Sequence, residues 1–155
     1  MQNISRANIT KLDRLYDLAN ENNIPIDRSC PDNIMSVSFK LPNELKIIGI
    51  REKYKQKQET DLELMAHEMG HCMTDSFYDP YSPLDLRGKH EYKANWWAIK
   101  KVIPFKDLCK AIKGGYREYW ELAEYFGVSE NFIHKTIELY RQKGKTVPKT
   151  YYEIN

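Results

Sequence analysis

The chain has 155 residues, with 24 basic and 22 acidic side chains and a formal net charge of +2. This length suits one domain, or one domain with a small appendage, and an apolar content of 41% is too high for a disordered chain. No run approaches the roughly 18 apolar residues of a membrane span, and the first residues lack the apolar stretch of a secretion signal. Three widely spaced cysteines argue against a disulfide framework. We therefore expect a cytoplasmic protein without membrane contact.

The first third of the chain predicts one helix and a small sheet. Apolar residues recur at spacings of three and four over residues 5–22, which predicts an amphipathic helix that ends before Pro25. Residues 34–40 and 46–51 predict two short strands, and the segment 41–44 between them has turn chemistry. An antiparallel pair of strands would follow from this arrangement.

The remainder of the chain predicts helices. Thr60 and Glu63 match a capping box, in which each side chain bonds the backbone of the other residue at the start of a helix. The helices are expected over residues 61–75, 89–103 and 105–113 and, on either side of a turn at 127–129, within 118–143, with a loop over 76–88. The fold class is therefore α+β, mostly helical, with a small sheet that contains an antiparallel pair.

The helix over 61–75 contains the chemically informative motif His67-Glu68-Met69-Gly70-His71. Two histidines four positions apart lie about 40° apart around a helix, so both imidazoles can bind one Zn²⁺ ion. Glu68 lies at the edge of the same face, where its carboxylate can accept a proton from a water that zinc has acidified. This pattern indicates a hydrolytic zinc site with Glu68 as the catalytic base.

A catalytic zinc needs a third protein ligand and an open position. The candidates are Asp75, Asp79, Asp85, His90 and Glu91. Glu91 is preferred because it shares a helix face with Ala94 and Ala98, small residues that would let the second helix approach the first.

Two neighbouring roles are less determined by the sequence. Asn95 lies one turn beyond Glu91 and could bond a ligand histidine, or it could be an ordinary helix polar residue. A donor for the transition-state oxyanion is also needed, and the residues do not distinguish among the candidates His90, Tyr78, Tyr92 and His134. Cys72 faces away from His71 and is expected to be a buried thiol.

The motif at 67–71, followed by Glu91-Tyr92-Lys93-Ala94-Asn95, resembles the ImmA/IrrE family of bacterial zinc metallopeptidases. The resemblance implies a gluzincin-like core in which His67, His71 and Glu91 bind one zinc ion and Glu68 is the general base. It also implies a bacterial or phage-encoded protein whose substrate is a protein, such as the transcriptional repressor of a mobile element. The pair Trp96-Trp97 departs from the smaller residue and Phe that family members often carry, which alters packing near the site.

Residues 118–141 resemble a helix-turn-helix, with Gly127 in the turn and Ser129 as a cap. Lys135 and Arg141 are the candidate DNA contacts, although acidic residues on the same helix make a poor phosphate-binding stripe. We expect a metallopeptidase domain over 1–113 and a helical subdomain over 114–155 that packs on it. Besides a peptidase, two alternatives remain open: a DNA-binding regulator with a non-catalytic metal site, and a protein that sequesters a repressor without cutting it.

Overall fold

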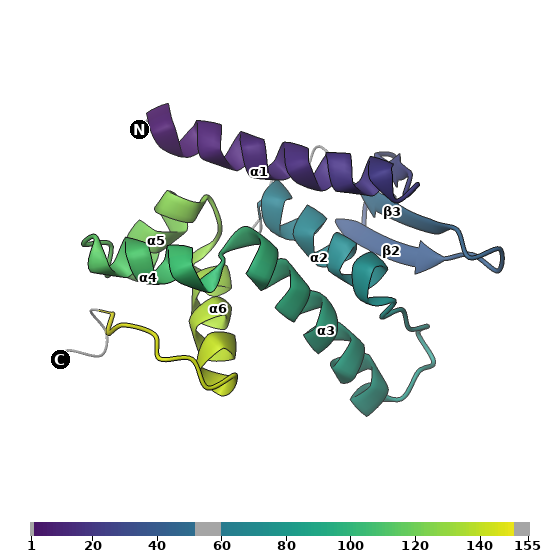
Figure 1. Cartoon of the computed structure of the whole chain (residues 1–155). Helices are drawn as coiled ribbons and strands as arrows, with labels where there is room; N and C mark the ends of the chain where they lie inside the picture. The colour runs from purple at the N-terminus through teal and green to yellow at the C-terminus, as the bar shows by residue number, and fades with distance from the viewer. Residues whose placement is uncertain (1, 52–59, 151–155) are drawn as a thin grey trace.

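The computed structural model describes residues 2–51 and 60–150. Helices and a small sheet form the described part, which confirms the expected α+β, mostly helical fold (Figure 1). In chain order the elements are α1 (Gln2–Glu21), β1 (Ile26–Asp27), β2 (Ser36–Lys40), β3 (Lys46–Ile50), α2 (Asp61–Thr74), α3 (Leu84–Val102), α4 (Phe105–Lys113), α5 (Tyr119–Phe126) and α6 (Glu130–Gln142). None of the described helices is both long and apolar enough to cross a membrane.

The sheet has the order β1-β3-β2. Strands β2 and β3 pair antiparallel, as predicted, with Ser38 opposite Ile48, and the turn between them closes where the Leu41 amide donates to the Leu45 carbonyl. Strand β1 pairs parallel with β3 and was not predicted, because two residues are too few to show a strand period. Strand β2 therefore lies at an edge of the sheet.

Helices α2 and α3 lie side by side and run in opposite directions (Figure 1). They approach closely because small residues face each other: a Cβ atom added at Gly70 would lie only 2.9 Å from the Cα atom of Ala94. Ala94, Ala98 and Val102 are buried, so the predicted inner face of the second helix is confirmed. This close contact brings the side chains of the two helices within reach of one another.

The predicted start of α3 at residue 89 is wrong, because the helix begins at Leu84, inside the segment 76–88 that was expected to be a loop. Pro83 precedes the first turn, where its fixed φ of −54° suits a helix start. Gly88 lies inside the helix, and a glycine there weakens the helical signal of the sequence. Only residues 75–83 connect α2 to α3.

The two C-terminal helices and their turn are present as predicted. Gly127 has a φ of 66°, and the Ser129 hydroxyl accepts a hydrogen bond from the Phe132 amide at the start of α6. Ile133 and Ile137 are buried in the same apolar cluster as Leu15 of α1, so one core extends through the described chain. Whether residues 114–155 act as a separate subdomain remains a prediction, and residues 151–155 lie outside the described part.

Candidate metal centre

Helices α2 and α3 bring His67, His71 and Glu91 together. The two Nε2 atoms are 3.2 Å apart, Glu91 Oε2 is 3.3 Å from His67 Nε2, and Glu91 Oε1 is 3.3 Å from His71 Nε2. The ligand atoms of a tetrahedral zinc site with bonds of about 2.0–2.1 Å are separated by about 3.3 Å. The three side chains therefore form one group that could hold a metal ion, and their spacing fits zinc.

Hydrogen bonds behind the imidazoles orient both Nε2 atoms towards the same point. His71 Nδ1 donates to the Ser76 carbonyl at 2.6 Å, and His67 Nδ1 lies 2.9 Å from the amide oxygen of Asn95. When Nδ1 carries the proton, the lone pair of Nε2 is free to bind a cation. Two lone pairs and a carboxylate that face one point repel each other unless a cation lies between them.

The charges of the three residues also favour a cation. Contacts with the imidazoles of His67 and His71 hold the pKa of Glu91 well below its usual range, so Glu91 is a carboxylate at neutral pH. Burial lowers the pKa of His67, but Glu91, Glu68 and Asn95 more than offset this and raise it. The site therefore attracts positive charge, and two imidazole nitrogens with one carboxylate are a ligand set that zinc accepts.

Glu68 lies in the same cleft, but it is not one of the three grouped residues. Its side chain is buried, and the Ser36 hydroxyl on β2 donates to Glu68 Oε1 at 2.7 Å. A carboxylate beside a metal site, held by a neighbour and not coordinated, is positioned to accept a proton from water. No sequence pattern indicated the contact with Ser36, because the two residues are on different elements and no local period connects them.

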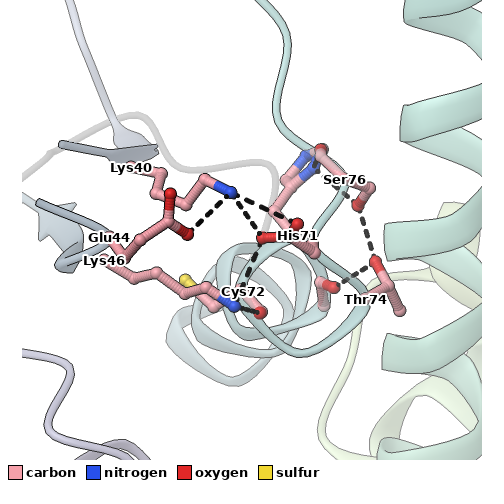
Figure 2. Close-up of polar contacts among 9 residues, drawn as sticks. Lys40, Glu44, Lys46, His71, Cys72, Thr74 and Ser76 are labelled. Atoms are coloured by element: carbon pink, nitrogen blue, oxygen red, sulfur yellow. Dashed lines mark hydrogen bonds and ion pairs between the residues drawn. The ribbon is translucent and has the colours of Figure 1, made fainter. Parts of the chain in front are cut away.

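The turn after α2 fixes the carbonyl that orients His71 (Figure 2). The Thr74 hydroxyl bonds the Gly70 carbonyl and the Ser76 hydroxyl, both at distances of 2.6–2.7 Å. Lys46 donates to the Cys72 carbonyl at 2.6 Å, which ties the end of α2 to β3. This network holds the backbone of Ser76 against the His71 ring.

The alternative third ligands lie elsewhere in the described structure. Asp75 forms ion pairs with Lys40 and Lys46, at 3.2 and 3.4 Å. His90, Asp79 and Asp85 do not belong to the group of possible metal ligands. Only Glu91 among the five candidates meets the two histidines.

Of the four candidate oxyanion donors, Tyr78 is the one whose hydroxyl bonds a candidate metal ligand, Glu91. Its hydroxyl donates to Glu91 Oε1 at 2.6 Å, and its ring centroid is 6.1 Å from that of His71. His134 packs against Tyr119, Lys143 covers the ring of Tyr92, and the ring of His90 stacks on that of Tyr78. These contacts leave Tyr78 as the best-placed donor.

The three candidate metal ligands line a cleft of about 760 Å³, together with residues of β2, α2, the connection after α2, α3 and the first turns of α6. Lys135 is part of the cleft wall, whereas Arg141 is exposed on the last turn of α6 and is not among the lining residues. The expected DNA contacts of these two side chains stay a prediction. Cys72 is buried, as predicted, and burial raises the pKa of its thiol to about 12.

A family model matches this chain over residues 23–138, more than half of its length, and is described as the IrrE N-terminal-like domain of peptidase family M78. The chain belongs to the M78 peptidase family. The resemblance found in the sequence motifs is thus confirmed, and the matched segment of this M78 protein contains the three candidate ligands and Glu68. Searches of curated proteins and of solved structures found no match. Family membership and the ligand geometry together support a metallopeptidase.

Proposed function

We propose that this M78 protein is a zinc-dependent endopeptidase of the bacterial cytoplasm that cleaves a protein partner, such as the repressor of a prophage or other mobile element. The observation that carries the proposal is the convergence of His67, His71 and Glu91 with a buried, uncoordinated carboxylate beside them. A purely structural metal site has no need for that carboxylate.

Each side chain has a distinct role in the proposed hydrolysis. His67, His71 and Glu91 would hold zinc, which when bound polarises the peptide carbonyl and acidifies water. Glu68 accepts the proton of the attacking water and passes it to the leaving amine, so that the peptide bond breaks and the C–O bond forms. Ser36 donates to one oxygen of Glu68 and so restricts the orientation of this carboxylate at the cleft. The Tyr78 hydroxyl, which donates to Glu91 Oε1, would be the hydrogen-bond donor for the developing oxyanion.

Among the described strands, β2 pairs only with β3, and the outer edge of β2 could therefore pair with a polypeptide substrate. The Arg51 amide donates to the Met35 carbonyl and the Leu41 amide to the Leu45 carbonyl, so the odd-numbered residues of β2 direct their backbone groups to β3. Because these groups alternate along an antiparallel strand, those of Ser36 and Ser38 point to the outer edge. Both residues line the cleft. An extended peptide that pairs with this edge would lie across the metal ligands.

The decisive experiment is incubation of the zinc-loaded protein, wild type and Glu68→Gln, with the repressor encoded beside its gene, followed by mass spectrometry of fragments and measurement of bound zinc. We expect both proteins to hold one zinc ion and only the wild type to cut, with a rate at least about 100-fold above that of the variant. Equal cleavage by both proteins, or a wild type that retains no zinc, contradicts the proposal. Tight binding of the repressor without fragments would instead support the sequestering alternative.

A further inference from the structure

The C-terminal helix α6 forms one wall of the metal cleft. Asn131, Phe132 and Lys135 line the same cleft as His67 and Glu68. Residues three and four positions apart share a helix face, so the first turns of α6 present one continuous side to the cleft. Lys135, a candidate DNA contact in the sequence, lines the cleft that contains the candidate metal ligands.

A buried carboxylate fixes this wall to the metal-binding helix. Glu63 lies one turn before His67 and is only 5% exposed. It accepts hydrogen bonds from the Ser129 hydroxyl at 2.6 Å and the Ser129 amide at 3.1 Å, in addition to the Thr60 amide of its own capping box. Since Ser129 is the N-cap of α6, the start of α6 is held at a fixed place relative to the metal ligands.

Among the described residues, the carboxylates that line the cleft do not pair with Lys135. The three carboxylates that line the cleft already have polar partners: Glu63 accepts from Ser129, Glu68 from Ser36, and Glu91 from Tyr78 while it also contacts the two histidines. Arg87 of α3, the other cationic side chain in the cleft lining, lies over the ring of Tyr78. Lys135 is exposed, and within the described ranges it forms no ion pair with a carboxylate. Three carboxylates and two cations give the cleft lining a formal charge of −1, and a bound divalent cation would change it to +1.

We propose that Lys135 is a substrate-binding residue that pairs with an Asp or Glu side chain of the peptide, a few residues from the scissile bond. This inference rests on the proposed peptidase function and adds a substrate class, segments of a protein partner that carry an acidic residue. An ion pair formed in a partly enclosed cleft is stronger than one on an open surface, because less water screens it.

The test measures peptide selection by the zinc-loaded Glu68→Gln protein, which holds peptides without cutting them. A randomised peptide pool is passed over the immobilised protein, and the retained peptides are sequenced by mass spectrometry. We expect about tenfold enrichment of Asp and Glu over Lys and Arg at one position, retention of this preference in Lys135→Arg, and its reversal in Lys135→Glu. Lys106→Glu, a charge reversal on exposed α4 outside the cleft, is the matched control and should select as the parent does.

An unchanged acidic preference in Lys135→Glu overturns the inference, as does selection without any charge preference or a pool that is not retained. Failure of the proposed function is visible separately, because the same pool is incubated with the wild type. If the wild type cuts no peptide while selection still reverses with Lys135→Glu, the peptidase proposal fails and the acidic-peptide site stands.

Discussion

The two ends of α2, the helix that contains His67 and His71, are held by different kinds of interaction. At the N-terminal end, the Glu63 carboxylate is 5% exposed and joins the start of α2 to the start of α6 through Ser129. At the C-terminal end, Lys40 and Lys46 reach Asp75, whose side chain is 58% exposed. Water can replace a lost partner at the exposed end but not at the buried end. The contacts at the buried end should therefore contribute to the free energy of unfolding and fix the position of α6 in the cleft. The contacts at the exposed end should contribute little to the free energy of unfolding.

Between these ends, α2 meets α3 through backbone, and Gly70→Ala should have the largest effect. The new Cβ atom would lie 2.9 Å from Ala94 Cα and 3.0 Å from Ala94 C, and neither atom can move without shifting α3. We expect a loss of about 3 kcal/mol in the free energy of unfolding in urea, together with weaker zinc binding as Glu91 moves away from the histidines.

Gly88→Ala is the matched control for this substitution. Gly88 lies within α3, where an added Cβ atom would meet nothing within 4 Å. Alanine has the higher helix propensity, so this variant should gain about 0.5–1 kcal/mol. If both alanine variants unfold at the same urea concentration, the close contact of α2 and α3 does not control stability.

Glu63→Ala should have the next largest effect. It leaves the amides of Thr60 and Ser129 without their acceptor in a buried place, which we expect to cost about 2 kcal/mol in urea unfolding. Glu121→Ala is the control, because Glu121 accepts from the backbone amides of Arg117 and Glu118 but links no second helix. A loss for Glu63→Ala no greater than that for Glu121→Ala would show that the link to α6 adds nothing.

Asn95→Ala tests whether the hydrogen bond behind His67 prepares the metal site. Without the amide oxygen, nothing holds the His67 ring with Nε2 towards the metal, and zinc affinity should fall about tenfold. Competition with a chromophoric chelator measures this change. Asn95→Asp keeps an acceptor oxygen and should bind zinc nearly as the wild type does, whereas equal affinities for all three proteins would contradict a role for Asn95.

Asp75→Asn should have the smallest effect. The hydrogen bond from Lys40 lowers the pKa of Asp75, so this ion pair contributes stability above the ordinary aspartate pKa of about 3.9, and the contribution is lost as the pH falls through the lowered value. The urea midpoints of wild type and variant should differ slightly at neutral pH and low salt, then converge in acid or high salt. A large difference at high salt would mean that the exposed end is not held mainly by charge.

Local sequence patterns predicted the elements that local physics controls. The capping box at Thr60, the turn at Gly127 and the cap at Ser129 depend on residues three or four apart, and each is present. The same proximity along a helix predicted that His67, Glu68 and His71 share a face, and small residues on the next helix indicated which face would approach it. Where local signals were weak, at two-residue β1 and at Gly88 near the start of α3, the prediction missed or misplaced the element.

Tertiary packing decided the contacts that turn these elements into a cleft. Ser36 reaches Glu68 across 32 positions and Ser129 reaches Glu63 across 66, and no periodicity relates residues so far apart. The sequence by itself determined that His67, Glu68 and His71 share one helix face, because their spacing on one helix fixes their directions. Tertiary packing alone also placed Lys135 in the lining of the cleft and the Tyr78 hydroxyl against Glu91.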